Sequence, residues 1–572
     1  MARLSNKLLF FTTSPRTPSK MIPEIKLLSE TFEGRKWDNQ TQEQFIDELA
    51  KSDFFEGNGS PSNKAFSARD RINRAPKALG FVDLSPSIAL TDAGKELVYG
   101  KRPQEIFLRQ LLKFQIPSPY HVETDGIEGT FCIKPYLEIL RSIRELDYLT
   151  FDELKIYGLQ LTDYRNFEEI KNKILQFRTG RTNYLGRYKL YSDAMVTETV
   201  KEVYGQRIED GNIKTRENSD DSLDTFISTQ KHNMNDYTDA CFRYLRYTGL
   251  VSIAHAHRSI SIAQDKVADV DYILSTVSRT PVYIDDVKKY KEYLFDSSTP
   301  VLYTDDKSSL ILSVARLSGE PAERLYKLDV NALKDKYDDI VAQQRDEMIH
   351  QQVDEIKSYS VYDDIMKTFS EITNRDYYDA PLMLEYNTWR AMTMLDGGNI
   401  KGNFKFDDMG EPLSTAAGNM SDIECYYDDY SLSVEVTMQQ GQRQYESEGE
   451  PVARHYGKLK KGSGKDTYCL FIAPSINPST YAFFYGLNHV HIDYYGGKSK
   501  IIPLTLEQFM QLLKQSKYRG GQRSQKELRD FLDVIMMTCD RATDENDWGM
   551  EIQACVTTWL KDDRAYNLSQ NS

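Results

Sequence analysis

The chain lacks long hydrophobic runs, paired cysteines and a surplus of positive charge. No run approaches the roughly 18 apolar residues that a membrane helix needs, and the apolar stretch Leu8 to Phe11 is too short for a signal peptide. Six cysteines are scattered without a C-x-x-C pair, which argues against a disulfide framework and a zinc cluster. These absences predict a cytoplasmic protein without membrane contact.

What the chain does have is length and unevenly placed charge. At 572 residues it is too long for one ordinary core, which predicts a multidomain protein. The net charge of -14 counts against nucleic-acid binding, because phosphate contacts require local positive charge. Residues 64–113, however, contain ten Lys or Arg against five Asp or Glu, so we expect any polyanion to bind the N-terminal part.

Two segments of the N-terminal half share the order helix, hairpin, helix. In residues 64–98 an arginine-rich helical stretch is followed by two short alternating runs, and Thr91 is the predicted N-cap of the next helix. Residues 236–272 repeat this order weakly. Between the two segments, Thr150 and Glu153 form a predicted capping box. The pattern is typical of winged-helix modules, of which we expect two or three.

The second half of the chain has a different pattern. From about residue 276 to 365 the sequence is helical and charged, which indicates either a linker or a solvated face of a neighbouring domain. Beyond residue 380 helices alternate with strands, which predicts a compact α/β domain. The helices are expected around 383–394 and 505–517, and the strands at 422–428, 431–438, 467–473 and 498–504.

The first two of these strands carry carboxylates on one face. Leu432 and Val434 point one way along the second strand, and Glu435 points the other way. A tight turn would bring Asp422 beside Glu435, where their repulsion requires a cation to offset it. Carboxylates without His or Cys companions suit a hard ion such as Mg²⁺. The alternative is that two acids 13 residues apart on predicted strands simply face solvent.

Histidines add further candidates. Glu448 and His455 are seven residues apart, so a helix would bring both onto one face. The pairs His255/His257 and His489/His491 would each share one face of a strand, but no third ligand is evident, so a structural role is favoured for them.

The chain resembles the AlwI-type family of type IIS restriction endonucleases and their strand-specific nicking relatives over nearly its full length. The matching blocks include "AFSARDRI", "LTDAGKEL", "RPQEIFLRQLLKFQIPSPYH", "LEYNTW", "STAAGNMSDIE", "VEVT", "EPVARHY" and "YCLFIAPSIN". The resemblance implies a cytoplasmic bacterial protein of a restriction-modification system, with a cleavage domain of the PD-(D/E)XK nuclease fold.

The resemblance also implies an active site. Asp422 and Glu435 match the acidic motif positions, Glu448 and His455 match two further active-site positions, and Glu385 matches an upstream acidic one. The implied cofactor is Mg²⁺, with Asp422, Glu435 and Glu448 as its ligands. Ser421 stands at the proline of the motif and Thr437 at its lysine. The second departure leaves open which group polarises the scissile phosphate, and the candidates are His455, Lys458, Lys460 and Lys461.

The expected fold class is multidomain α+β. The layout is a winged-helix DNA-recognition region at 1–275, with subdomains of about 1–125 and 126–275, a helical linker at 276–365 and a cleavage domain at 366–572. Recognition is assigned to the arginine-rich helix and the N-terminal arm, with Arg69, Arg71, Arg74, Arg16 and Lys20 as the contacting residues. For each of them, a phosphate contact or a surface role is the alternative to base reading.

The predicted function is Mg²⁺-dependent hydrolysis of double-stranded DNA a few base pairs outside a short asymmetric recognition sequence. One alternative is a nicking enzyme of the same family. The choice depends on whether two cleavage domains pair, as a transient homodimer or with a second small subunit. The other alternative is a non-catalytic winged-helix regulator, which accounts for the N-terminal half and leaves the carboxylates without a role.

Overall fold

The computed structural model describes residues 2–4, 7–52, 54–55, 61–123, 130–181, 188–214, 222–374, 377–408, 410–416, 418–521 and 523–559. The chain divides into two compact units, residues 1–340 and 341–572. The boundary between them falls within α17 (Val330–Lys357), a helix inside the predicted linker. The functional division at residues 275 and 365 stays a prediction. In the part of the chain described, no helix is long and apolar enough to cross a membrane.

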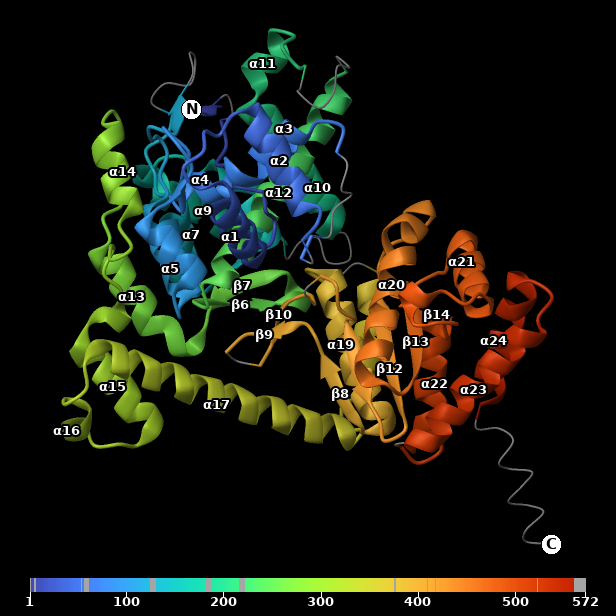
Figure 1. Cartoon of the computed structure of the whole chain (residues 1–572). Helices are drawn as coiled ribbons and strands as arrows, with labels where there is room; N and C mark the ends of the chain where they lie inside the picture. Colours follow the sequence, from blue (N-terminus) through green and yellow to red (C-terminus); the bar gives the residue numbers. More distant parts are fainter. Residues whose placement is uncertain are drawn as a thin grey trace, which may run out of the picture. The chain divides into compact units, whose positions relative to one another are not determined.

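The N-terminal unit is mainly helical, with short strands between its helices (Figure 1). Strands β2 and β3 form a hairpin, β5, β7 and β6 form an antiparallel sheet, and β1 pairs with β4 in parallel. The elements up to residue 156 are β1 (Ala2–Leu4), α1 (Met21–Phe32), α2 (Asn39–Leu49), α3 (Lys64–Ile72), α4 (Ala75–Ala78), β2 (Val82–Asp83), β3 (Ala89–Leu90), α5 (Asp92–Tyr99), α6 (Pro103–Lys113), β4 (His121–Glu123), α7 (Pro135–Glu145), β5 (Tyr148–Thr150) and α8 (Phe151–Ile156). The elements that follow are α9 (Phe167–Arg181), α10 (Tyr188–Val203), α11 (Gly205–Glu209), α12 (Leu223–Tyr247), β6 (Val251–Ala254), β7 (Ser259–Ile262), α13 (Val267–Thr276), α14 (Val287–Phe295), α15 (Lys307–Ser318) and α16 (Ala322–Leu325).

Local sequence signals set several of these boundaries. The Thr91 hydroxyl accepts a hydrogen bond from the Gly94 backbone N–H at 2.9 Å, and so caps α5 as predicted. Thr150 and Glu153 form the predicted capping box at the start of α8. The helix, hairpin and helix expected in residues 64–98 are present, because each signal acts within a few residues of its own position.

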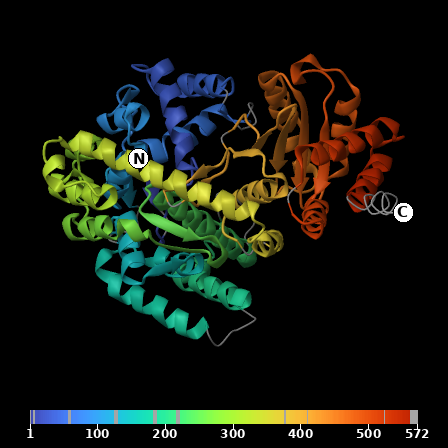
Figure 2. The same cartoon turned by 90° about the horizontal axis from the view of Figure 1, so that it is seen from below.

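The C-terminal unit contains a five-stranded mixed sheet. Its strand order is β14-β13-β12-β11-β8, in which β12, β13 and β14 are parallel and β11 is antiparallel to both of its neighbours. Figures 1 and 2 show these strands side by side with helices packed along them. The elements are α18 (Tyr362–Thr373), α19 (Ala380–Asp396), β8 (Asn399–Gly402), β9 (Lys405–Phe406), β10 (Pro412–Ser414), β11 (Ile423–Tyr426), β12 (Tyr430–Val436), α20 (Gln442–Ser463), β13 (Asp466–Ala473), α21 (Pro478–His489), β14 (Ile501–Thr505), α22 (Leu506–Tyr518), α23 (Gln525–Arg541) and α24 (Glu545–Thr558).

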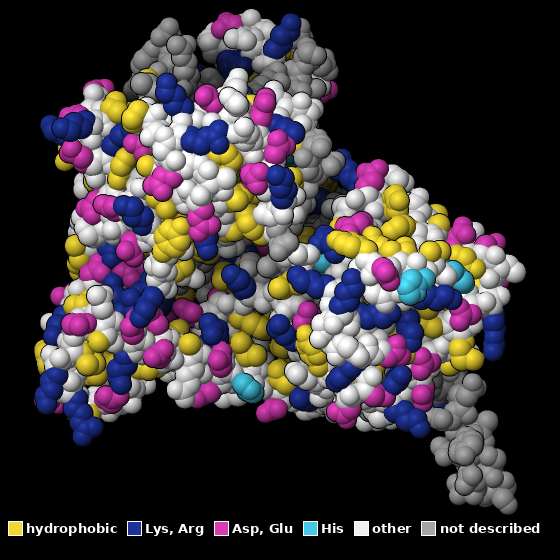
Figure 3. Space-filling view, viewed as in Figure 1, with side chains coloured by type: hydrophobic (Ala, Val, Ile, Leu, Met, Phe, Trp, Pro, Cys, Tyr) yellow, Lys and Arg dark blue, Asp and Glu magenta, His cyan; other side chains and the backbone are white. Residues whose placement is uncertain are grey.

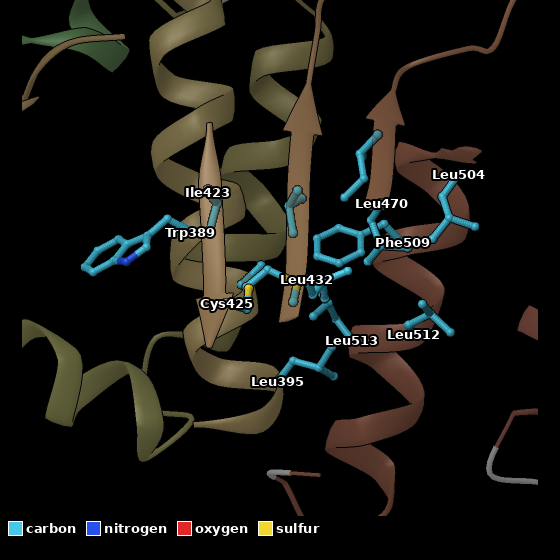
Figure 4. Close-up of a cluster of buried hydrophobic side chains, with 14 of the residues drawn as sticks. Trp389, Leu395, Ile423, Cys425, Leu432, Leu470, Leu504, Phe509, Leu512 and Leu513 are labelled. Carbon is cyan, nitrogen blue, oxygen red and sulfur yellow. The ribbon is translucent and has the colours of Figure 1, made fainter. Parts of the chain in front are cut away.

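Side chains of this sheet enter a core on each face. Leu470 and Ile472 of β13 join a large core with side chains of α19 and α22, and Figure 4 shows Leu470 among them. Their neighbours Cys469 and Phe471 pack on the opposite face against α20 and α21. A strand covered on both faces reads as a continuous apolar run, as "YCLFIA" does. The sheet is therefore a middle layer, and α20 covers the face from which Glu435 projects.

A glycine allows α20 to lie close to the chain that precedes β14. A Cβ atom on Gly457 would lie only 2.7 Å from Cα of Tyr495, so a larger residue would force this helix away. The position of α20 matters because the helix carries Glu448 and His455.

Candidate active site

The hairpin of β11 and β12 brings the predicted acidic pair to one end of the sheet. Ile423 is paired with Val434, so Asp422, directly before β11, lies beside Glu435. The Val436 backbone N–H donates to Oδ2 of Asp422 at 2.8 Å. Ile423 and Val434 fix this register because both are fully buried in the large core.

A third carboxylate reaches the same place from α19. Glu385 is buried, and its Oε2 accepts a hydrogen bond from the Ala416 backbone N–H at 2.9 Å. Burial raises the pKa of Glu385 well above its ordinary value, and the negative charge of Asp422 adds to the rise, with a smaller contribution from Glu435. These acids therefore repel one another in the absence of a cation.

Helix α20 supplies the remaining two predicted residues from one of its faces. The Thr437 hydroxyl donates to Oε1 of Glu448 at 2.8 Å. Two turns later, Nδ1 of His455 lies 3.2 Å from Oε1 of Glu435. The segment from 442 to 463 is helical, as the seven-residue spacing requires, so all five predicted residues belong to one cluster.

The cluster consists mainly of acidic side chains, and its own histidine does not offset their charge. Burial raises the pKa of Glu435 well above its ordinary value, and the charge of Glu448 contributes to that rise. Burial also raises the pKa of Glu448. The pKa of His455 falls to about 4 because its ring is buried, so the imidazole is uncharged near pH 7. Its Nε2 is buried and has no hydrogen-bond partner within the described ranges.

The oxygen-rich donor set fits a hard divalent cation. Among the described residues, no three His, Cys, Asp or Glu side chains converge closely enough to surround a metal ion by themselves. Mg²⁺ does not require such a cage, because it is commonly held by one or two carboxylates together with water and substrate phosphates. Asp422 and Glu435 are the residues that would hold it, and a cation there would offset the repulsion that Glu385 experiences.

The structure separates the three candidate lysines. Lys458 donates to the backbone oxygen of Asn419 at 3.1 Å, three residues before Asp422. Lys460 and Lys461 instead donate to the backbone oxygens of Lys498 and Tyr494, at 2.9 and 3.0 Å. Of the three, Lys458 is therefore the one tied to the loop that carries Asp422.

Sequence reasoning missed Arg454, which lies one turn before Lys458 on α20. Its guanidinium donates to the side-chain oxygen of Asn419 and to Oε2 of Glu450 at 3.2 Å. The four-residue spacing of Arg454 and Lys458 on a helix places two cations on one face, and this signal was present in the sequence.

The strand placement of the two histidine pairs is wrong. His255 and His257 lie in a short 3-10 helix between β6 and β7, with His255 buried and His257 exposed. His489 ends α21 and its Nδ1 lies 2.8 Å from the Tyr485 backbone oxygen, whereas His491 lies beyond the helix, 3.2 Å from Asp493. The alternating pattern of apolar residues continues in the sequence past the end of the regular element. It therefore does not place the two histidines of a pair on one face.

The predicted DNA-contacting residues lie in the N-terminal unit. Arg16, Lys20 and Arg71 line one groove of about 610 Å³, although they come from segments far apart in the sequence. Arg69 and Arg74 are not among the described residues that line it. Arg69 donates to Gln42 at 2.7 Å, and Arg74 forms an ion pair with Asp70 at 2.6 Å.

The chain is similar to known restriction endonucleases. The family model of the AlwI restriction endonuclease matches residues 77–512. No curated protein matches the chain. Among solved structures, the small subunit of the heterodimeric restriction endonuclease R.BspD6I is 28% identical over 34% of this chain and 98% of its own, with a TM-score of 0.29. Restriction endonuclease FokI is 11% identical over 90% of this chain and 96% of its own, with a TM-score of 0.22.

These TM-scores are too low for either structure to support an argument about this one. The family match, in contrast, covers most of the chain. The protein belongs to the AlwI restriction endonuclease family.

Proposed function

We propose that the protein is a type IIS site-specific endonuclease. It binds a short asymmetric sequence in double-stranded DNA and, with Mg²⁺, hydrolyses phosphodiester bonds a few base pairs outside that sequence. The observation that carries the proposal is the convergence of five polar side chains at one end of one sheet, in a chain of a restriction endonuclease family. They are Glu385, Asp422, Glu435, Glu448 and His455.

We assign the C-terminal unit to the PD-(D/E)XK nuclease fold. The support is a mixed sheet, covered by helices on both faces, with an acidic pair where β11 begins and β12 ends. We assign winged-helix recognition modules to the N-terminal unit, on the order of α1, α2, α3, the β2–β3 hairpin and α5.

In the proposed mechanism Asp422 and Glu435 would hold Mg²⁺. Bound there, the ion would supply a water of lowered pKa and positive charge beside the scissile phosphate. The Val436 N–H keeps the Asp422 carboxylate oriented, and the Thr437 hydroxyl does the same for Glu448. Thr437, which stands at the lysine position of the motif, thus acts as a positioning group rather than a cation.

His455 and Lys458 are assigned the remaining roles. If Nδ1 of His455 donates to Glu435, its Nε2 becomes a proton acceptor, as the removal of a proton from water requires. Lys458 takes the place of the motif lysine toward the phosphate, because it is the lysine tied to the Asp422 loop.

Digestion of a supercoiled plasmid tests the proposal. With Mg²⁺ we expect discrete linear fragments whose sequenced ends lie at a fixed distance from a shared motif, and with a chelator we expect intact plasmid. The Glu435→Gln variant serves as the matched control, since it differs from the wild type by one buried polar atom. Specific DNA binding without cleavage under any divalent ion would favour the regulator instead.

The same gel decides between double-strand cleavage and nicking. The described residues of each chain supply one cluster of these five side chains, so cutting both strands in a single binding event would use a second cleavage domain. A second copy or a separate small subunit would provide it. Accumulation of open circles at high enzyme concentration would identify a nicking enzyme, whereas linear product that rises with the square of concentration would indicate a transient homodimer.

A further inference from the structure

The groove in the N-terminal unit is built from three segments. The arm supplies Arg16 and Lys20, α1 supplies Glu24, and α3 supplies the opposite wall. Basic and acidic side chains alternate over the face of this unit seen in Figure 3. Where neither positive nor negative charge predominates, base recognition depends on the geometry of individual groups rather than on a broad basic patch.

Helix α3 has one buried and one exposed face. Ala65, Ala68 and Ile72 pack into the core, and each is at most 6% exposed. The other face consists of residues spaced three or four apart, and it lines the groove. Its members are Asn63, Phe66, Ser67, Asp70 and Arg71. This helix therefore presents polar groups on a fixed support.

The Arg71 guanidinium is held from two sides. Its Nη1 donates to Oε1 of Glu24, which is buried on α1. Its Cζ lies 5.1 Å from the centre of the Phe55 ring. The side chain keeps 28% of its surface exposed. A carboxylate on one edge and a ring on the face fix the orientation of the guanidinium, and no partner for Nε or Nη2 is present among the described residues.

The other arginines assigned to recognition either use more of their donor atoms or lie outside the groove lining. Arg16 has Nη2 at 2.7 Å from Asp236 and Nε at 3.6 Å from Asp239. Arg74 uses Nη1 for Thr13 and Nη2 for Asp70. Arg69 donates to Gln42 and lies outside the groove lining. Arg71 is thus the arginine with an unused donor edge on a fixed support beside the groove.

We propose that Arg71 determines sequence specificity by donating to a guanine of the recognition sequence, and that Glu24 is its positioning residue. This inference rests on the proposed function, since it concerns how that nuclease selects its site. A guanidinium matches O6 and N7 of guanine with two parallel donors, whereas an ammonium can offer only a point charge. The buried Glu24 carboxylate restricts the rotation that would otherwise let the fork reach other acceptors.

The test compares Arg71→Lys with the wild-type full chain. A random-sequence duplex library is selected for binding without divalent metal, and the bound DNA is sequenced. We expect the wild type to select a motif, and Arg71→Lys to lose its preference for guanine at one position by about 10- to 100-fold. The other positions of the motif should persist, because the substituted side chain keeps the positive charge and can still pair with Glu24.

Arg35→Lys is the matched control. Arg35 also lies near a ring, with its Cζ 5.1 Å from the centre of Phe32, and it donates to Gln44 at 2.6 Å, but it does not line the groove. We expect its motif to equal that of the wild type. Glu24→Gln provides a second route, and it should weaken the preference at the same base pair, by less than Arg71→Lys does.

Each outcome decides the question. An unchanged guanine preference in Arg71→Lys, or an equal loss of affinity for all sequences, would overturn the assignment while leaving the nuclease proposal intact. Failure of the wild type to select any motif would instead overturn the proposed function, and this inference with it. Thermal unfolding of all variants identifies a loss of specificity that comes from misfolding.

Discussion

The two units of the molecule differ in the partners of their buried acidic side chains. In the N-terminal unit buried acids have cationic partners: fully buried Glu138 accepts from Arg279 at 2.6 Å, and buried Glu153 accepts from Arg178 at 2.9 Å. In the C-terminal unit Glu385 and Glu435 are buried beside further acids, and their pKa values are raised because burial and like charge both disfavour the ionised form.

This difference distinguishes charged groups that stabilise the fold from charged groups that are available for chemistry. A buried ion pair is complete within the fold, and breaking it leaves one charge without a partner. A buried group of like charges is incomplete, so it costs stability unless a ligand neutralises it. The Glu153–Arg178 pair therefore joins α8 to α9, and the Glu138–Arg279 pair joins α7 to the segment after α13. The C-terminal cluster, in contrast, would be stabilised by a bound cation.

The largest expected effect is on cleavage. Glu435→Gln should lower the cleavage rate by about a thousandfold, because removal of a metal-holding carboxylate forfeits several kcal/mol of transition-state stabilisation. Plasmid digestion measures the rate, and a gel shift on the selected motif should give unchanged binding. Full cleavage by this variant would contradict the proposed difference between the two units, since the cluster of acidic side chains would then have no role in catalysis.

The same substitution in the other unit should act on stability instead. Glu138→Gln should lower the free energy of unfolding by about 3 kcal/mol, because the partly exposed Arg279 would lose both of its charge-assisted hydrogen bonds to the buried carboxylate. Denaturant unfolding followed by tryptophan fluorescence measures this. Glu435→Gln is its counterpart, and we expect that change to leave stability unaltered or to raise it. Equal destabilisation by both would contradict the distinction between the units.

A buried histidine in the N-terminal unit makes stability depend on pH. Burial lowers the pKa of His121 from 6.5 to about 4. The unfolded chain therefore binds a proton that the folded chain does not between these two pH values, so stability is complete above pH 6.5 and falls as the pH drops toward 4. The expected loss is about 3 kcal/mol.

Denaturant unfolding at pH 6.5 and at pH 4.5 checks this dependence. In His121→Gln much of the loss should disappear, whereas His232→Gln, whose parent side chain is 78% exposed, should behave like the wild type. The same acid sensitivity in His121→Gln and the wild type would show that another group is responsible.

The smallest effect concerns the cation itself. At a Mg²⁺ concentration tenfold above its dissociation constant, the C-terminal unit should gain about 1.4 kcal/mol of stability through ligand binding to the folded state. Thermal unfolding with and without Mg²⁺ measures the gain. Glu435→Gln should lose it and Glu138→Gln should keep it, because only the first variant alters the cluster.

Short-range signals in the sequence predicted much of the local structure. The caps at Thr91 and Thr150 and the alternation of Leu432, Val434 and Glu435 depend on neighbours a few residues away, and the structure contains them. The placement of the two histidine pairs on strands was wrong because period-two alternation persists in the sequence where the backbone has already turned. The alternation carries no information on where a strand ends.

The sequence by itself determined the family, the acidic hairpin and the helical spacing of Glu448 and His455. All three depend only on the order and spacing of residues along the chain. Only the tertiary structure decided that Lys458 rather than Lys460 or Lys461 is tied to the Asp422 loop, and that Arg71 is braced by Glu24. Each of these facts joins residues far apart in the chain or turns on which way a side chain faces. The packing of whole helices against the sheet and against one another sets such relations, and no local pattern encodes them.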